Sequence, residues 1–440
     1  MSLSDVFGSP LVPIAVLVLG AVVVLLLASL AKRNALLPSL LGFLFALAAG
    51  VIGHLLGGGG LAVLALCLVA ALTCLLVPVL DAAVPEHVVE AAALVLLGTA
   101  GAIGLAQATD LIQAVVGLET LALSAVVLVA LGTGDKALEA AFKYFVLGAI
   151  SLAGLLFGVG LIYLGTGSFG FPTANQLTSN TLVLTGAVMA AMGLGFELAI
   201  FPFHWGALDA YTAAVPSVAG FVMSASKLAA AFALGQLVLA AGLPLAQLLV
   251  WVGCLTIVWG TFGALGQAAS LRRMLAYSAI THAGFIALAL GCGPSGPQTA
   301  TFYAAIYGSM AMLVFAALAG RGVDQFDLTK LGRWRAVALG LGLFSLSGIP
   351  PTPGFWAKLA VLVVAWQAAG PLPTLIATAG GVFSVLYYLR PLPDLFAALR
   401  AAPPARALPG LGSAPAIALA TVVVALFGLV PSVVWSIAGH

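Results

Sequence analysis

Long apolar blocks, each about the length of one bilayer crossing, alternate with short polar connections along the whole chain. An apolar run of about 20 residues spans the hydrocarbon core as a single α-helix. The first seven blocks lie at about 11–31, 36–57, 60–80, 88–107, 111–132, 138–164 and 182–206. Seven more lie at about 217–241, 246–268, 273–292, 298–320, 334–369 (with an internal break), 371–390 and 413–437. The pattern predicts an all-α polytopic membrane protein with about fourteen transmembrane helices.

The composition agrees with this fold class. Of 440 residues, 63% are hydrophobic and only 6% are charged, and the mean hydropathy is +1.23, whereas a soluble domain has about 25% charged residues. A soluble protein is therefore excluded. A membrane-anchored enzyme with a water-soluble domain is excluded too, because no polar stretch is long enough to fold separately. The net charge of +2 gives no reason to expect nucleic acid as a partner, so the lipid bilayer is the expected surrounding.

Basic residues gather in alternate connections, and this distribution predicts the orientation. Lys and Arg are retained on the cytoplasmic side of a membrane. Twelve of the fifteen follow odd-numbered blocks: Lys32, Arg33, Lys136, Arg272, Arg273, Arg321, Lys330, Arg333, Arg335, Arg390, Arg400 and Arg406. We therefore predict that both termini lie on the non-cytoplasmic side. The first block has no basic region before it, so we expect it to remain as the first helix and not to be cleaved as a signal peptide.

Five ionisable residues fall inside the predicted helices. They are Glu119, Lys143, Glu197, Lys227 and Lys358. A charge inside a membrane helix is costly, and such residues usually belong to ion or proton pathways. Carboxylates and amines of both signs at mid-membrane depth therefore predict a proton relay. A static network of buried ion pairs is the alternative, and Lys143, near the start of its helix, could instead extend to the interface.

Two of the predicted helices are interrupted beside a charge. In the seventh, Pro202 follows Glu197. In the twelfth, four helix-breaking residues precede Lys358, namely Pro350, Pro351, Pro353 and Gly354. Proline removes a backbone donor and frees carbonyls inside the membrane. Broken helices beside buried charges, in corresponding places of two halves, mark the conduction sites of inverted-repeat transporters, although kinks made for packing alone would look similar.

The spacing of these breaks predicts the organisation of the chain. The two broken helices are five apart, and a shift of five helices reverses the orientation. We expect helices 1–4 at 1–107, with helix 4 beginning a first five-helix repeat at 88–241. A second, inverted repeat would occupy 246–390, followed by a loop and helix 14 at 391–440.

Five sequence runs carry a resemblance to a known family. They are EAAFKYFVLGAISLAGLLFGVGLIYLGTGS, GLGFELAIFPFHWGALDAY, SASKLAAAFAL, LRRMLAYSAITHAGF and GIPPTPGFWAKL. Together they resemble the antiporter-like membrane subunits of respiratory complex I over about residues 110–390. The N type of these subunits is the most similar, because its sisters tend to carry a histidine where this chain has Lys227.

The resemblance implies a polar axis that carries or gates protons. Glu119, Lys227 and Lys358 match residues of that axis, Lys143 matches the lysine of the family's KYF stretch, and His282 matches the histidine of its YSSIAHAGY motif. Where the family has a lysine in the seventh helix, this chain has Glu197. Two nearby carboxylates tend to share one proton. Our hypothesis is that Glu197 still carries protons, partnered by Lys227 or Lys143; the rival is that this half of the path has been rewired or lost.

Two further residues are candidates near the seventh helix. His204 could relay protons, because its side chain titrates near physiological pH, or it could simply pack at the helix break. Asp209 is expected at the cytoplasmic mouth of the path, either as an entrance or as a solvated loop charge.

The chain offers no site for a cofactor of its own. The four cysteines lie in apolar blocks without metal-ligand or disulfide spacing, so no redox chemistry is expected in this chain alone. The resemblance implies that NADH, FMN, iron–sulfur clusters and quinone belong to partner subunits. It also implies other membrane-arm subunits and a peripheral arm as partners, and the bacterial inner membrane as the location.

Three other functions remain open from the sequence. A subunit of a multisubunit sodium/proton antiporter or of a membrane-bound hydrogenase would share the fold. A free-standing secondary carrier would transport alone. A structural membrane-arm spacer would carry no protons at all.

Overall fold

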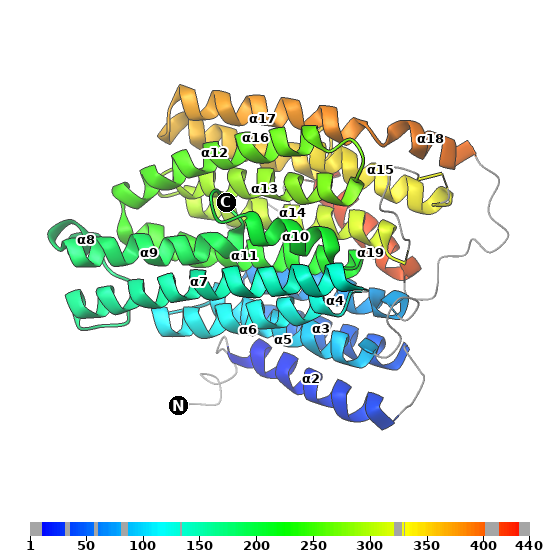
Figure 1. Cartoon of the computed structure of the whole chain (residues 1–440), viewed down its shortest axis with the longest axis horizontal. Helices are drawn as coiled ribbons and strands as arrows, with labels where there is room; N and C mark the ends of the chain where they lie inside the picture. The colour runs from blue at the N-terminus through cyan, green and yellow to red at the C-terminus, as the bar shows by residue number, and fades with distance from the viewer. Residues whose placement is uncertain are drawn as a thin grey trace.

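The computed structural model is an all-helical bundle, and the long helices run along a common axis (Figure 1). The structure describes residues 11–30, 36–56, 60–80, 87–132, 134–320, 328–329, 331–400 and 413–430. The helices are α2 Leu11–Leu30, α3 Leu36–Leu55, α4 Leu61–Leu80, α5 Val88–Ala106, α6 Leu111–Ala130, α7 Asp135–Thr166, α8 Ala174–Ser179, α9 Thr181–Leu198, α10 Trp205–Ala213, α11 Pro216–Ala241, α12 Leu243–Gly266, α13 Leu271–Leu290, α14 Gly296–Leu318, α15 Arg333–Ser347, α16 Pro353–Ala368, α17 Pro371–Leu389, α18 Leu392–Arg400 and α19 Ser413–Leu429. Within these ranges there is no β-strand, only one isolated bridge.

Every apolar block predicted from the sequence coincides with one helix or with a broken pair of helices. Among the described residues, eleven helices are long and apolar enough to cross a membrane, and α2 and α19 contain shorter apolar stretches. The all-α membrane class is thus confirmed, while the number of fourteen crossings stays a prediction. Five of the basic residues used for the orientation, and most of the predicted C-terminal loop, lie outside the described residues: Lys32, Arg33, Arg321, Lys330, Arg406 and 401–412.

The structure corrects the sequence analysis at three connections. The seventh predicted helix is broken, as expected, into α9 and α10, but its second part continues to Ala213 and does not end near residue 206. Residues Ala174–Ser179 and Leu392–Arg400 form the short helices α8 and α18 where loops were expected. All three are short and polar enough to be missed by a search for blocks of about 20 apolar residues.

Two helices form the centre of the bundle. α11 and α14 pack against each other and are almost entirely buried. In Figure 1 the N-terminal helices α2 to α6 lie on one side of this centre, and α12, α16 and α17 lie on the other. The long helix α7 buries only a small part of its surface, so its apolar side chains face outward, as expected for contact with lipid or another membrane protein.

Glycines let three pairs of helices approach backbone to backbone. A Cβ atom at Gly117 of α6 would lie 2.4 Å from the amide nitrogen of Leu105 in α5, and one at Gly284 of α13 would lie 2.6 Å from that of Ile257 in α12. Gly158 of α7 likewise faces α9. Inside a bilayer there is no hydrophobic driving force between helices, so membrane helices associate by close packing at such small residues.

The two broken helices end in the same backbone conformation. α9 is followed by Ala199 at φ 64°, and α15 by Gly348 at φ 82°. In both, the next amide returns to the carbonyl five residues earlier, from Ile200 to Gly195 and from Ile349 to Phe344. This left-handed cap satisfies carbonyls at the helix end. Each cap is followed by a turn containing one cis proline peptide bond.

Arginine side chains cap helix ends elsewhere. The buried Arg335 of α15 donates hydrogen bonds to the carbonyls of Ala317 and Ala319 at the end of α14, and to the Ser413 hydroxyl at the start of α19. Arg390 donates to the Leu265 and Gln267 carbonyls at the end of α12. A cation at a helix C-terminus pairs with the carbonyls that have no partner in the helix.

Replacing Gly284 by alanine tests the close helix contact. The added methyl group must push α12 away from α13, so we expect a loss of about 1–3 kcal/mol of stability. A thermal unfolding series on the purified membrane protein measures it. Gly160→Ala is the matched control, because a Cβ there meets open space. Equal melting temperatures for the two variants would contradict the packing described for this helix pair.

Candidate proton pathway

Lys227 lies at the middle of the bundle, on the buried helix α11, and its side chain has no exposed surface. Its Nζ atom donates a hydrogen bond to the Tyr211 hydroxyl of α10 at 3.3 Å. The same atom lies 4.8 Å from the centroid of the Tyr211 ring and 5.8 Å from that of Tyr307 in α14. Aromatic faces attract a cation. The ammonium group is therefore held by one hydroxyl and two rings, and no carboxylate within the described residues forms an ion pair with it.

Glu197 is the last residue but one of α9 and is also buried. Its Oε1 atom accepts no hydrogen bond from the described part of the chain. Lys227 and the half-buried Glu119 of α6 both interact electrostatically with this carboxylate. The Ser226 hydroxyl is also near the carboxylate. The Glu197 carboxylate therefore interacts electrostatically with one lysine and with a second carboxylate.

His282 continues the polar row on α13. Its Nδ1 atom lies 2.7 Å from the Tyr303 hydroxyl, and its Nε2 atom lies 3.1 Å from that of Tyr388. The ring lies 4.9 Å from Tyr307, the same tyrosine that faces Lys227. Both Lys227 and Lys358 are close enough to interact electrostatically with this imidazole. His282 thus shares Tyr307 with Lys227 and interacts electrostatically with both buried lysines.

Lys358 occupies the broken helix pair α15–α16. Its Nζ atom donates hydrogen bonds to the backbone carbonyl of Ser347 at 2.7 Å and to the Ser384 hydroxyl of α17 at 3.0 Å. Ser347 is the last residue of α15, so the helix break supplies the carbonyl that accepts this hydrogen bond. Glycine is favoured at the neighbouring position 348, because its φ is 82° and a Cβ atom there would lie 2.9 Å from the Cδ atom of Lys358.

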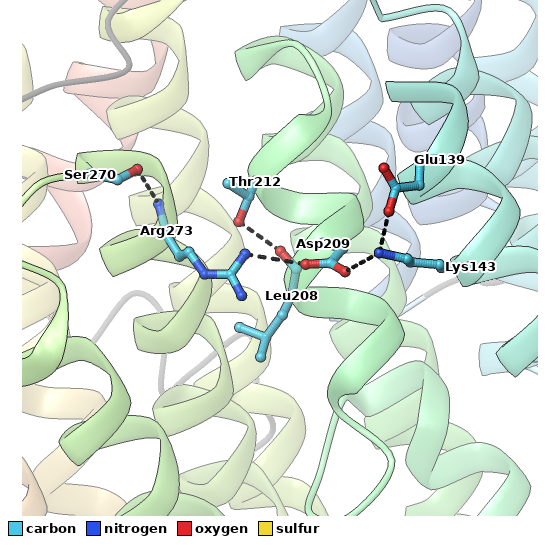
Figure 2. A network of polar contacts seen from close by, with 7 residues as sticks. All are labelled: Glu139, Lys143, Leu208, Asp209, Thr212, Ser270 and Arg273. Carbon is cyan, nitrogen blue, oxygen red and sulfur yellow. Dashed lines mark hydrogen bonds and ion pairs between the residues drawn. The ribbon is translucent and has the colours of Figure 1, made fainter. Parts of the chain in front are cut away.

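A second, more exposed network lies at the other break, on α10 (Figure 2). The Asp209 carboxylate lies 3.2 Å from the Arg273 guanidinium of α13 and 3.5 Å from the Lys143 ammonium of α7. Lys143 also pairs with Glu139, one turn earlier in α7, at 2.6 Å. The four charges alternate in sign and connect three helices.

A cavity of about 470 Å³ opens beside this network. Its walls combine the charged groups with apolar side chains, and it is lined by Phe142, Lys143, Val146, Leu147, Trp205, Leu208, Asp209 and Arg273. Asp209 therefore borders an open space while Tyr211, two residues further along α10, is buried against Lys227.

His204 packs among aromatic rings at the start of α10. It is fully buried, and its ring lies between 5.0 and 5.7 Å from those of Phe201, Trp205 and Trp259. Neither ring nitrogen has a hydrogen-bond partner within the described residues. The amide of Phe201 at this break donates to the Thr256 hydroxyl of α12. The arrangement is that of a packing residue, and a relay role for His204 stays a prediction.

The structure divides the residues predicted from the sequence into two groups. Glu197, Lys227, His282 and Lys358 are buried, on α9, α11, α13 and α16, and we call these four residues the buried row; Glu119 of α6 is half-buried. Lys143, counted among the charges inside the helices, is 48% exposed and lies in the surface network with Asp209. It emerges because α7 buries little of its surface, and its ion pairs are with Glu139 and Asp209, not with Glu197.

Sequence analysis missed the tyrosines that line the row. Tyr211, Tyr303, Tyr307 and Tyr388 are all buried and each contacts Lys227 or His282. These tyrosines lie inside apolar blocks, and a buried hydroxyl needs a polar partner. Their positions could therefore have indicated polar contacts in the interior.

Fold and site together define the class: a multi-pass membrane protein with a row of ionisable residues across its interior. Such rows mark proton or ion pathways. Residues 108–384 match the family described as "NADH:quinone oxidoreductase/Mrp antiporter, TM". The chain belongs to this family.

Curated relatives and solved structures agree with this assignment. The chain is 34% identical over 366 residues to NADH-quinone oxidoreductase subunit N of Methylobacterium nodulans, covering 79% of this chain and 75% of the relative. It is 38% identical over 315 residues to the subunit N of Beijerinckia indica, covering 68% and 66%. The alignment thus spans between two thirds and three quarters of these relatives' length.

Two solved structures share nearly the whole fold. A chain of respiratory complex I from Thermus thermophilus superposes with a TM-score of 0.82 at 29% identity, covering 97% of this chain and all of that one. A chain of an archaeal membrane-bound sulfane sulfur reductase gives 0.83 at 25% identity, covering 98% and 96%.

Gly348 after α15 and Ala199 after α9 have the same left-handed conformation, so substitutions at these two positions test the Lys358 site as a pair. Gly348→Ala places a side chain in a left-handed conformation, which costs about 1–2 kcal/mol, and its Cβ meets Lys358. We expect lower thermal stability and impaired proton transport in the assembled protein.

Ala199→Gly at the equivalent cap is the comparison. It removes the same backbone penalty, and we expect stability equal to or above that of the parent. If Gly348→Ala behaves like the parent in both assays, the proposed need for space beside Lys358 is wrong.

Proposed function

We propose that this chain is a proton-translocating membrane-arm subunit of an NADH-quinone oxidoreductase. The observation that carries the proposal is the row of buried ionisable residues, Glu197, Lys227, His282 and Lys358, joined by tyrosines within a chain of this family. Its relatives named as subunit N support the particular assignment. NADH oxidation and quinone reduction would occur in partner subunits, and this chain would couple them to proton transfer across the membrane.

The proposed path enters on the cytoplasmic side beside Asp209 and Lys143, where a cavity reaches the charged network. It continues through Glu197 and Lys227 to His282, and leaves past Lys358. Hydrogen-bonding groups that can change partners are required for proton transfer, and the tyrosine hydroxyls at Lys227 and His282 supply them. A static ion-pair network is disfavoured, because neither buried lysine forms an ion pair with a carboxylate in the described residues.

Glu197 would replace the family's lysine as a proton carrier. Its carboxylate is near both Glu119 and Lys227. Two carboxylates in one buried site cannot easily both ionise, so one proton is held between them, and a charged Lys227 favours its release. In this proposal the protonation state of the carboxylate pair follows the charge on Lys227.

We also propose the two inverted repeats, at 88–241 and 246–390. Their support is structural correspondence: both broken helices end in the same left-handed cap, with the same returning amide, before a proline turn. In addition, the first two helices of each proposed repeat, α5–α6 and α12–α13, pack through facing glycines.

Partners, location and orientation follow from the same proposal. The partners would be other membrane-arm subunits and a peripheral arm that carries FMN, iron–sulfur clusters and the NADH and quinone sites. The location would be a bacterial inner membrane, with both termini on the non-cytoplasmic side.

A subunit of another membrane complex of this family is the second candidate. The similarity to a chain of the archaeal sulfane sulfur reductase is as extensive as that to complex I. Membranes in which NADH-driven pumping is absent but ion exchange depends on this chain would favour that candidate.

Three substitutions test the proposed path in membranes that contain the assembled complex. Lys227→Ala removes the central amine, and Glu197→Gln removes the carrier carboxylate. We expect each to lower proton pumping by about tenfold or more, as for loss of a general acid or base. Glu197→Lys restores the family residue, and we expect pumping near the parental level.

Pumping and NADH:quinone turnover are measured together, after assembly has been checked by native electrophoresis. Gly160→Ala on the outer face of α7 is the control for handling of the variants. Normal pumping by assembled complexes with both Lys227→Ala and Glu197→Gln would overturn the proposal and favour a structural spacer.

A further inference from the structure

The short helix α10 carries two polar contacts on opposite sides. Asp209 and Tyr211 are two residues apart, and a helix turns by about 100° per residue, so their side chains point in nearly opposite directions. Asp209 points toward the surface network, and Tyr211 points into the bundle, where its hydroxyl meets Lys227. One rigid turn of helix therefore links the surface charges to the central lysine.

The surface side of α10 is held from two directions. Asp209 pairs with Lys143 of α7 and with Arg273 of α13, as Figure 2 shows. The backbone of Arg273 is held at the start of α13, because its amide donates a hydrogen bond to the Ser270 hydroxyl. Two anchors on different helices restrict rotation of α10 about its own axis, which a single ion pair would leave free.

The buried side of α10 packs in the core but forms no ion pair within the described residues. Gly206, Ala207 and Ala210 give it small apolar contacts, and the turn before it, with Pro202, lacks regular helical hydrogen bonding. The bond from Tyr211 to Lys227 is its one polar contact with α11 within the described residues. Packing holds the buried Tyr211 in the bundle, and within the described residues the ion pairs that orient α10 lie on its surface side.

We propose that Asp209 is a positioning residue for Lys227. Its two ion pairs fix the orientation of α10, and α10 in turn holds the Tyr211 hydroxyl beside the Lys227 ammonium. Because α13 also carries His282, the same anchor keeps the tyrosine of one proposed repeat in register with the histidine of the next. This inference rests on the proposed function, in which Lys227 carries protons.

Hydrogen–deuterium exchange of the α10 amides in the assembled complex tests the anchor itself. Asp209→Asn removes the charge but keeps the size, and we expect exchange over residues 205–213 to become about tenfold faster. Asp209→Glu keeps the charge and should restore slow exchange. Arg273→Gln removes the ion pair between α13 and Asp209 but keeps the one with Lys143, so we expect an intermediate exchange rate. This variant can replace Asp209→Asn if the latter fails to assemble.

Asp135→Asn is the matched control, because Asp135 is an exposed acidic residue of α7 for which the described residues provide no ion pair. Its α10 exchange should equal that of the parent. If exchange in Asp209→Asn is also parental, the anchor does not hold α10 and the inference is overturned.

The link from Asp209 to Lys227 is tested by combining substitutions. Tyr211→Phe removes only the hydroxyl, and we expect it and Asp209→Asn each to lower pumping by about ten- to a hundredfold, in line with loss of a hydrogen bond to a charged group. If Asp209 acts through Tyr211, the double variant is no worse than either single variant. Reductions that multiply would mean independent roles and would overturn the inference.

The two proposals fail in different ways. If Lys227→Ala pumps normally, the proposed function fails and this inference fails with it. If Lys227→Ala abolishes pumping while Asp209→Asn pumps as well as the parent or as Asp209→Glu, the proposed function stands. Only the positioning role of Asp209 is then wrong.

Discussion

An ammonium group buried in a bilayer needs acceptors that only the protein can supply, and this requirement shapes the interior of the chain. Lys358 meets it with a carbonyl freed by a helix break, and Lys227 meets it with a tyrosine hydroxyl and two ring faces. Neither lysine is neutralised by a carboxylate in the described residues. Both therefore remain sensitive to nearby charge, which is the property a proton relay requires.

The helix breaks follow from the same requirement. A continuous helix bonds its carbonyls internally and offers nothing to a buried cation, so α15 has to end where Lys358 needs an acceptor. Its left-handed cap takes Gly348, because the lysine side chain lies against that residue. The break between α9 and α10 ends with the same geometry but serves a different purpose, since it frees a short helix that joins Asp209 to Tyr211.

Much of this arrangement could be predicted from the sequence, because helices that cross a membrane require long apolar blocks that are easily recognised. Apolar blocks located the helices, and the prolines beside Glu197 and Lys358 located both breaks. The exposure of Lys143 could not be predicted, because it depends on which face of α7 turns outward, and an evenly apolar helix carries no sign of that. The tyrosines around His282 come from two helices, α14 and α17, and Tyr388 lies 106 residues away along the chain, so only the folded chain brings them together.

The central claim is that the two buried lysines belong to one conducting row joined at His282. The most direct measurement is the number of protons pumped per NADH oxidised by assembled complexes carrying His282→Leu, reconstituted in sealed vesicles. This substitution leaves Lys227 and Lys358 in place and removes the imidazole, with its hydrogen bonds to Tyr303 and Tyr388. The account predicts that the proton yield falls while the complex remains assembled; an unchanged yield would contradict it.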